Sequence, residues 1–248
     1  MTAGRLGALP GMVALALLIS APTHAAPRQA APPIEEGRAL YQQACSSCHG
    51  SSAQGGVVEG RVAPALVGRG AARVDFWLST GRMPLATPTA AAIRKPPAFA
   101  PAQRAAIVAY VESLGPGGPA IPTVDLVRAS LVDGGELYRQ NCAACHQAAG
   151  IGGALSYGDF APPLHSATPV QIAEAIRTGP GNMPVFGADT LTDQQVNDIV
   201  RYVRYLRHPE DRGGAGLGHS GPAAEGFLGL LGGLGVLMAV IYWIGTKE

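Results

Sequence analysis

The sequence predicts an all-α protein that consists of two tandem domains of one fold, followed by a single C-terminal transmembrane helix. Three observations support this prediction: a long residue pattern occurs twice, each copy closes on apolar residues at helical spacing, and a 20-residue uncharged stretch lies near the C-terminus. Charged residues make up only 14% of the 248 residues and form no run of one sign, which argues against a nucleic-acid-binding protein. Four cysteines are too few for a disulfide scaffold in a chain of this length.

The repeated pattern divides the chain into domains at 34–115 and 125–208. Both copies open with Gly-x-x-Leu-Tyr-x-Gln-x-Cys-x-x-Cys-His and continue with Ala-Pro-x-Leu, Thr-Gly and Met-Pro in the same order. Because the match extends through whole domains, each copy is predicted to fold as one unit. The stretches 116–124 and 209–222 are rich in glycine and proline and are predicted to be linkers.

Two segments of each copy are predicted to be helices, namely the Leu-Tyr segment before the first cysteine and the closing segment. Apolar residues recur at i, i+3, i+4 and i+7 in the closing segments, which begin at Ile107 and Ile199. The second closing helix is expected to start after Thr192, which forms a capping-box pattern with Gln195. Four tyrosines recur in pairs and are predicted to pack where the first and last helices cross: Tyr41, Tyr110, Tyr138 and Tyr202.

The N-terminal segment has the composition of a secretory signal. Residues 1–25 combine the positive charge of Arg5 with an apolar run and a small-residue exit. We therefore predict a signal peptide that is cleaved after Ala25 or Ala26. A retained N-terminal membrane helix is the alternative, although the run is shorter than the ~20 residues that a span requires.

The C-terminal segment has the composition of a membrane span. Residues 226–245 carry no charge and match the ~20 residues needed to cross a bilayer. Tyr242 and Trp243 lie where interfacial aromatic residues are expected, and Lys247 beyond them predicts a cytoplasmic C-terminus. Both domains would then lie on the extracytoplasmic side of the cell membrane. The glycines of this span would let a partner helix approach closely.

The pattern Cys-x-x-Cys-His occurs once in each domain. Two thiols one helical turn apart match the two vinyl groups on one edge of a haem, and the adjacent imidazole can ligate the iron. A thioredoxin-like redox pair would require a βαβ context that is absent, and a zinc site shared between the pairs would leave both histidines unexplained. The pattern therefore predicts two covalently bound haem c groups, held by Cys45, Cys48 and His49 and by Cys142, Cys145 and His146.

Each iron needs a second axial ligand, and the repeat offers Met83 and Met183. Both methionines precede a proline at matched places of the two copies, which favours a ligand over a core residue. A thioether opposite an imidazole raises the reduction potential and completes the coordination of the iron. Four metal ligands are therefore predicted, His49, Met83, His146 and Met183, and no catalytic site.

The prolines of Ala-Pro-x-Leu, Pro64 and Pro162, are expected to accept a hydrogen bond from Nδ1 of the ligand histidines through their backbone carbonyl groups. The remaining histidines have no such support in the repeat. They are expected to have structural or solvated roles: His24, His165, His208 and His219.

Each copy resembles a mono-haem cytochrome c of the small all-α type, in its Cys-x-x-Cys-His, the Pro-Leu after it, the methionine and the closing helix. The order of signal, two haem motifs and a single C-terminal span further resembles the di-haem cytochrome c subunit of the actinobacterial cytochrome bc complex, a quinol–cytochrome c reductase. Residues 134–138 and 177–184 carry most of this closer likeness. The first copy departs from it in a methionine loop that is two residues shorter and in an insertion at 88–98.

The resemblance implies a membrane-anchored electron-transfer subunit with two cytochrome c domains. In that family the subunit lies beside a Rieske iron–sulfur protein and a cytochrome b, and it passes electrons to a terminal oxidase. A freestanding membrane-tethered shuttle and an oxidase cytochrome subunit are alternatives within electron transfer. A di-haem peroxidase is the alternative among enzymes, but it needs one iron open to substrate, and two matched methionines argue against it.

Charge is distributed unevenly between the copies. Residues 34–115 hold eight basic and five acidic side chains, whereas residues 125–211 hold six and ten. This asymmetry predicts two different docking faces, one for the Rieske protein and one for the oxidase, because complementary charge sets the encounter rate and register of partners. The linker at 115–123 is expected to be flexible and to set the distance between the haems.

Overall fold

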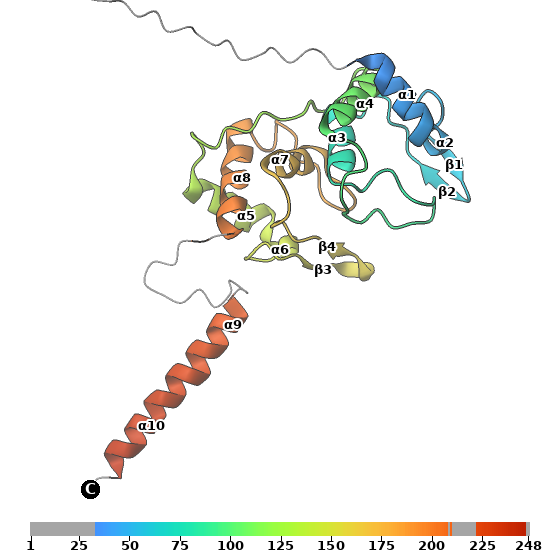
Figure 1. Cartoon of the computed structure of the whole chain (residues 1–248). Helices are drawn as coiled ribbons and strands as arrows, with labels where there is room; N and C mark the ends of the chain where they lie inside the picture. Colours follow the sequence, from blue (N-terminus) through green and yellow to red (C-terminus); the bar gives the residue numbers. More distant parts are fainter. Residues whose placement is uncertain (1–32, 208, 210–221, 247–248) are drawn as a thin grey trace, which may run out of the picture. The chain divides into compact units, whose positions relative to one another are not determined.

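The computed structural model describes residues 33–207, 209 and 222–246, and its elements follow the order of the repeat (Figure 1). The signal peptide predicted at 1–25 lies outside the described residues. The first domain contains α1 (Ile34–Ala44), α2 (Ser46–His49), β1 (Gly56–Val58), β2 (Arg61–Ala63), α3 (Ala71–Ser79) and α4 (Pro101–Ser113). The second repeats them as α5 (Leu131–Asn141), α6 (Ala143–His146), β3 (Gly153–Ala154), β4 (Phe160–Ala161), α7 (Pro169–Thr178) and α8 (Asp193–Arg207). The predominance of helices confirms the predicted fold class.

The first and last helices of each domain cross at a glycine of the repeat. α1 packs against α4, and α5 packs against α8. A Cβ atom on Gly37 would lie 1.9 Å from the carbonyl oxygen of Ala106, and one on Gly134 would lie 2.0 Å from that of Asp198. Any side chain at these two positions would therefore force the helices apart, and this explains why the same glycine occurs in both copies.

Tyrosines fill both crossings, as predicted. The ring centroids of Tyr41 and Tyr110 lie 5.4 Å apart, and those of Tyr138 and Tyr202 lie 5.3 Å apart. Aromatic pairs at such distances contribute about 1 kcal/mol beyond the burial of their area. Tyr41 and Tyr138 are fully buried, and each lies in the apolar core of its own domain.

The start of α8 confirms the predicted capping box. The hydroxyl oxygen of Thr192 accepts a hydrogen bond from the backbone N–H of Gln195 at 3.3 Å, and Oε1 of Gln195 accepts one from the N–H of Thr192 at 2.8 Å. In α4 the equivalent position is Ala100, so only the reverse bond is made, from the N–H of Ala100 to Oε1 of Gln103 at 3.0 Å.

Two short antiparallel hairpins follow the cysteine motifs, and the sequence analysis did not anticipate them. β1 and β2 pair with Val58 opposite Arg61, so a two-residue turn joins them. Glu59 and Gly60 in this turn have φ of 49° and 75°, the left-handed pair typical of a type I′ turn. In the second domain Ala154 lies opposite Phe160, with a 3-10 turn between the strands. Strands of two or three residues are too short to give an alternating pattern.

The linker between the domains is fixed at both ends. The carbonyl oxygen of Pro119 accepts a hydrogen bond from the N–H of Ala72 at the start of α3, at 3.1 Å. Past the linker, the N–H of Asp125 donates to Oδ1 of Asn197 on α8 at 3.2 Å. These contacts tie the chain near the linker to both domains, whereas a flexible tether was expected at 115–123.

The domains contact each other through α3 and α7, which are equivalent helices of the repeat. Arg73 at the start of α3 donates to the carbonyl oxygen of Thr178 at the end of α7, and Gln171 at the start of α7 donates to that of Ser79 at the end of α3. The two helices therefore run antiparallel. Arg73 and Gln171 occupy equivalent places, since each precedes the threonine of a Thr-Gly pair by seven residues. The contact thus has approximate twofold symmetry.

A buried carboxyl group lies in this interface. Glu174 of α7 is 0% exposed, and neither of its carboxyl oxygens has a hydrogen-bond partner of good geometry in the described part of the chain. Burial, together with the neighbouring Asp75 of α3, raises the pKa of Glu174 to about 9, and Arg104 opposes this rise. Glu174 therefore carries a proton at neutral pH.

The C-terminal helix is long and apolar enough to cross a membrane. It comprises α9 (Pro222–Phe227), a π-helical segment (Leu228–Gly233) and α10 (Leu234–Gly245) (Figure 1). The most apolar 18-residue window of residues 223–245 has a mean hydropathy of 2.2, and at 1.5 Å per residue the helix extends over about 34 Å. This helix agrees with the span predicted at 226–245, and glycines are concentrated in its π-helical segment.

We predict that replacement of Glu174 by Gln removes a pH dependence of stability. The folded protein binds the Glu174 proton between the ordinary pKa of 4.5 and the raised pKa of about 9, whereas the unfolded chain does not. The contribution of this group to stability therefore falls as pH rises through that range, by up to about 1.4 kcal/mol per pH unit. Thermal unfolding of the haem-loaded protein at about pH 5 and pH 8 measures the difference.

In that experiment E174Q should lose less stability between the two pH values than the wild type. The matched control is Glu112→Gln, which removes an exposed carboxylate from α4 and should behave like the wild type. Equal pH dependence in E174Q and the wild type would show that Glu174 is ionised in the folded protein.

Candidate haem-attachment sites

Each Cys-x-x-Cys-His motif forms a short helix at the end of the first helix of its domain. Cys45 follows α1, and its N–H donates to the carbonyl oxygen of Tyr41 at 2.8 Å. The N–H of His49 then donates to the carbonyl oxygen of Cys45 at 2.9 Å, which closes the turn of α2. The motif of α6 has the same two bonds, also at 2.8 and 2.9 Å. This helical turn gives both thiol pairs the one-turn spacing that haem attachment requires.

A backbone carbonyl group orients the ring of each ligand histidine. Nδ1 of His49 lies 2.9 Å from the carbonyl oxygen of Pro64, and Nδ1 of His146 lies 3.0 Å from that of Pro162. Both contacts were predicted from the repeat and are confirmed. A carbonyl oxygen can only accept, so each Nδ1 carries the proton and each Nε2 keeps its lone pair for a metal.

The buried tyrosines also hold the backbone that follows each histidine. The hydroxyl of Tyr41 donates to the carbonyl oxygen of Gly50 at 2.8 Å, and that of Tyr138 donates to Gln147 at 2.8 Å. Burial raises the pKa of both hydroxyls, so both remain protonated donors. The sequence analysis assigned these tyrosines to the helix crossing, with haem contact as the alternative, and did not predict these hydrogen bonds. In both copies the acceptor carbonyl lies nine residues after the tyrosine, and this shared spacing is the sequence signal that could have predicted the bonds.

The structure brings each predicted methionine to the same apolar core as the first cysteine of its own motif. Cys45 and Met83 both pack against the core of the first domain, and Cys142 and Met183 both pack against that of the second. The N–H of Met83 donates to the carbonyl oxygen of Trp77 at 3.0 Å, which ties the methionine loop to α3. One thioether therefore lies with each cysteine motif.

All four cysteines are free thiols. Burial raises the pKa of Cys45 and Cys142 to about 11, with a smaller contribution from the second cysteine of each pair. A thioredoxin-like pair has the opposite property, a thiol pKa below its ordinary value. Nor do the two motifs join into one cluster of metal ligands among the described residues. The geometry therefore disfavours both alternatives to haem attachment.

The residues present in each domain fit a haem c group. The two thiols would attach it through its vinyl groups, and the free Nε2 and the methionine sulfur would be available to ligate the iron. Carbonyl groups and tyrosine hydroxyls, already in place, hold the histidine and its loop. The residues that would hold the two haems are Cys45, Cys48, His49 and Met83, and Cys142, Cys145, His146 and Met183.

The insertion in the first copy supports the methionine loop. The N–H of Lys95 donates to the carbonyl oxygen of Thr80 at 3.3 Å, and its Nζ donates to that of Pro84 at 2.8 Å. These contacts lie on both sides of Met83. The segment 88–98 therefore secures a loop that is two residues shorter than its counterpart.

Of the remaining histidines, His165 has the structural role that was expected. Its Nε2 lies 2.8 Å from the carbonyl oxygen of Ala149, in the loop after the second cysteine motif. The other three lie outside the described residues: His24, His208 and His219.

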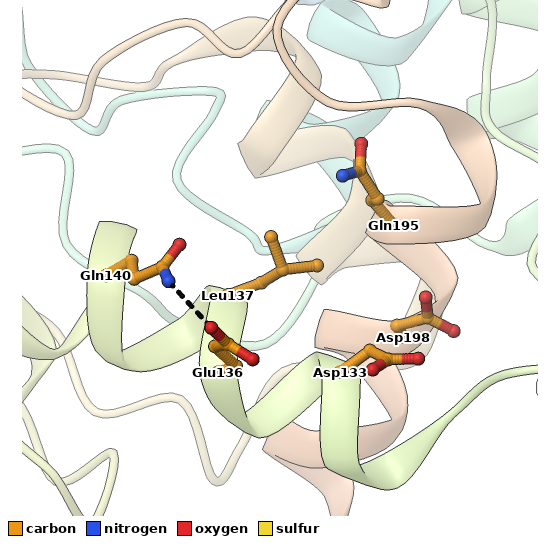
Figure 2. A pocket seen from close by; sticks show the side chains of 6 residues that line it. All are labelled: Asp133, Glu136, Leu137, Gln140, Gln195 and Asp198. Atoms are coloured by element: carbon orange, nitrogen blue, oxygen red, sulfur yellow. Dashed lines mark hydrogen bonds between the residues drawn. The ribbon is translucent and has the colours of Figure 1, made fainter.

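A pocket of about 340 Å³ lies between α5 and α8, and none of the predicted haem-binding residues lines it. Figure 2 shows that its lining consists mainly of carboxylate and amide side chains on the two helices. The Oδ1 atom of Asp198 already accepts from the N–H of Ser130 at 2.6 Å and from Nε2 of Gln194 at 2.9 Å. This carboxylate therefore fixes the start of α5. The lining residues are Asp133, Glu136, Leu137, Gln140, Gln195 and Asp198.

Comparison with known proteins assigns both domains to cytochromes. The family model described as "Cytochrome c" matches residues 34–115. The family model described as "Cytochrome C oxidase, cbb3-type, subunit III" matches residues 129–203. Each match covers one copy of the repeat and includes its Cys-x-x-Cys-His motif.

Three curated relatives are each named cytochrome bc1 complex cytochrome c subunit. The protein of Corynebacterium diphtheriae is 39% identical over 232 residues, which cover 87% of this chain and 81% of the relative. That of Mycobacterium tuberculosis is 41% identical, with 87% and 78% covered. That of Corynebacterium efficiens is 38% identical, with 100% and 88% covered. The chain therefore belongs to the family of cytochrome c subunits of the cytochrome bc1 complex.

Proposed function

We propose that this protein is a membrane-anchored electron-transfer subunit that binds one haem c in each of its two domains. The observation that carries the proposal is the matched donor set, in which each domain combines two free thiols and a carbonyl-bound histidine with a methionine that packs against the same core as the first thiol. When bound, each haem supplies an iron that carries one electron. The residues of the chain attach the haem, complete its coordination and fix the histidine ring.

Six-coordinate iron is the feature that separates this proposal from a peroxidase. A peroxidase must leave one coordination position of a haem open to substrate. Here each domain offers both an imidazole and a thioether, and the loops that carry Met83 and Met183 have backbone bonds at 3.0 and 3.2 Å. Both irons would therefore exchange electrons without binding a substrate, and the proposal assigns no catalytic site to the residues that the structure describes.

The position in the cell follows from the two ends of the chain. The signal peptide at 1–25 would export the domains, the span at 226–245 would retain them, and Lys247 would remain in the cytoplasm. The protein is thus a single-pass protein of the cell membrane with both haems outside. The helix at 223–245 is long and apolar enough to cross a bilayer, which supports the proposal that the two domains are tethered to the membrane.

Membership in the family supports partners within a cytochrome bc complex. We propose that the subunit assembles with cytochrome b and the Rieske iron–sulfur protein, accepts electrons from the Rieske protein and passes them toward a terminal oxidase. The glycines at the π-helical segment would let helices of such partners approach the span closely. A freestanding tethered shuttle is the second candidate, because the chain carries its own anchor.

The first prediction is that the mature protein carries two haems. Cys142→Ala should lose the second haem and destabilise the second domain, because a domain of fewer than ~100 residues has a small core without its cofactor. A pyridine haemochrome assay together with the intact mass counts the haems. Cys45→Ala is the reciprocal control and should lose only the first haem. A wild-type protein with one haem would contradict the assignment.

The second prediction concerns the methionines. Oxidised wild-type protein should show the weak absorption band at about 695 nm that accompanies methionine ligation of haem c. Met83→Ala and Met183→Ala should each remove about half of this band, because each takes the ligand from one iron. Each variant should then bind carbon monoxide at the opened position. Met238→Ala, in the span, is the matched control and should leave the band unchanged, whereas an intact band in M83A would exclude Met83 as a ligand.

The third prediction distinguishes the complex from the shuttle. Affinity purification from membranes dissolved in mild detergent should recover cytochrome b and Rieske subunits with this chain. The same preparation should oxidise a quinol and reduce the two haems c. Recovery of the di-haem protein alone, from membranes that contain the other subunits, would favour the shuttle.

A further inference from the structure

We infer that Arg94 holds the two haem domains in one relative orientation and so acts as a positioning residue for electron transfer between the haems. Arg94 lies in the segment 88–98, which the second copy of the repeat lacks. Its Nη2 donates to the carbonyl oxygen of Ser166 at 2.9 Å and to Oε1 of Gln171 at 2.6 Å, and both acceptors belong to the second domain. The inference rests on the proposed function, since it concerns transfer between two bound haems.

The acceptor of Arg94 is itself held from several sides. Gln171 is 6% exposed, and its Nε2 donates back to the first domain, to the carbonyl oxygen of Ser79 at 3.1 Å and to its hydroxyl at 3.2 Å. Its Oε1 also accepts from the N–H of Thr168 at 3.1 Å, at the start of α7. The amide therefore presents Oε1 to Arg94 in one fixed direction. A preorganised acceptor of this kind makes a charge-assisted hydrogen bond geometrically specific.

Arg94 also breaks the symmetry of the contact between the domains. The bonds of Arg73 and Gln171 are related by the approximate twofold axis of α3 and α7. Arg94 has no counterpart in the second domain. Its two bonds therefore select one register of the helix pair, and with it one arrangement of the haem domains.

Part of the positive charge of the first domain is concentrated at this contact. Arg73, Arg82 and Arg94 have pKa values lowered mainly by burial and then by a neighbouring arginine, and they remain cationic at neutral pH. Arg82 lies over the ring of Phe76 on α3, with its guanidinium carbon 5.3 Å from the ring centroid. Arg73 faces the carbonyl end of α7, where the helix dipole favours a cation. Arg94 lies near Arg207 of the second domain, a like charge, so its two hydrogen bonds to neutral acceptors, and not charge pairing, hold this side of the contact.

The test compares Arg94→Ala, Arg94→Lys and the double variant Arg73→Ala/Arg94→Ala in the full, haem-loaded chain. Loss of a charge-assisted hydrogen bond weakens docking about tenfold to a hundredfold. Pulsed electron paramagnetic resonance measures the distribution of distances between the two oxidised haems, and photoreduction of one haem measures the rate of transfer to the other. Arg128→Ala is the matched control, because it removes an arginine with an 84% exposed side chain at the surface of the second domain.

We expect a single narrow distance in the wild type and in R128A. R94A should broaden the distribution and slow the transfer. R94K should fall between R94A and the wild type, because both bonds come from the planar guanidinium and a flexible ammonium group does not hold two acceptors in fixed directions. The double variant should show the largest change. The haem count, the reduction potentials and the band of methionine ligation should stay at wild-type values in all variants, because Arg94 touches no haem ligand.

Two results would overturn the inference. One is a double variant whose distance distribution and transfer rate equal those of the wild type. The other is loss of the methionine band in R94A, which would place the effect of Arg94 on the first haem itself. Failure of the proposed function would look different: the wild type would keep a narrow distance distribution but would exchange no electrons with quinol-reduced membranes.

Discussion

The contact between the first and last helices of each domain determines where the predicted haem ligands lie. At Gly37 and at Gly134 the backbones approach so closely that only hydrogen fits between them. This approach buries Tyr41 and Tyr138, whose hydroxyls then hold the carbonyl groups directly after His49 and His146. The histidine rings are bound in turn by proline carbonyl groups from the returning loop. Each domain thus connects a helix crossing to the orientation of an imidazole through two hydrogen bonds.

This connection also explains why the motif around the cysteines is longer than haem attachment alone requires. Two thiols and an imidazole need only five residues, but the repeated pattern begins eight residues before the first cysteine, at the glycine. The glycine permits the close helix crossing. The crossing buries the tyrosine, whose hydroxyl then holds the loop of the histidine. A larger residue at Gly37 would separate α1 from α4 and would displace the hydroxyl that anchors the loop of His49.

Most of the haem site could be predicted from the sequence because its parts are local and occur twice. The predicted ligands, the proline carbonyl groups and the tyrosine pairs all recur at matched positions, so a role inferred for a residue in one copy is supported by its counterpart in the other. The contact between the domains could not be predicted in this way. Arg94 and Gln171 are 77 residues apart, and Arg94 belongs to the segment that has no counterpart in the repeat. The contacts near the linker were missed for a related reason: its composition suggests freedom, but Pro119 and Asp125 are tied to α3 and α8.

The contact between α3 and α7 changes the interpretation of the charge asymmetry. An excess of basic residues in the first domain suggested a face for an external partner, yet two of its arginines, Arg73 and Arg94, are directed at the second domain. Under the proposed function the domains would act as one di-haem unit, in which transfer between the haems would depend on packing within the chain and the outer surfaces would remain for partners. The equivalent helices α3 and α7 pack together, and Arg94, which has no symmetry-related counterpart, selects one arrangement of the two domains.

The account depends most on two irons that each have a histidine and a methionine ligand. Low-temperature electron paramagnetic resonance of the fully oxidised, haem-loaded protein tests this point most directly, because it reports the spin state of each ferric haem. The account predicts two low-spin signals of equal intensity and no high-spin signal at neutral pH. A high-spin ferric signal from either haem would contradict it, since it would show an iron with an open or weakly held sixth position.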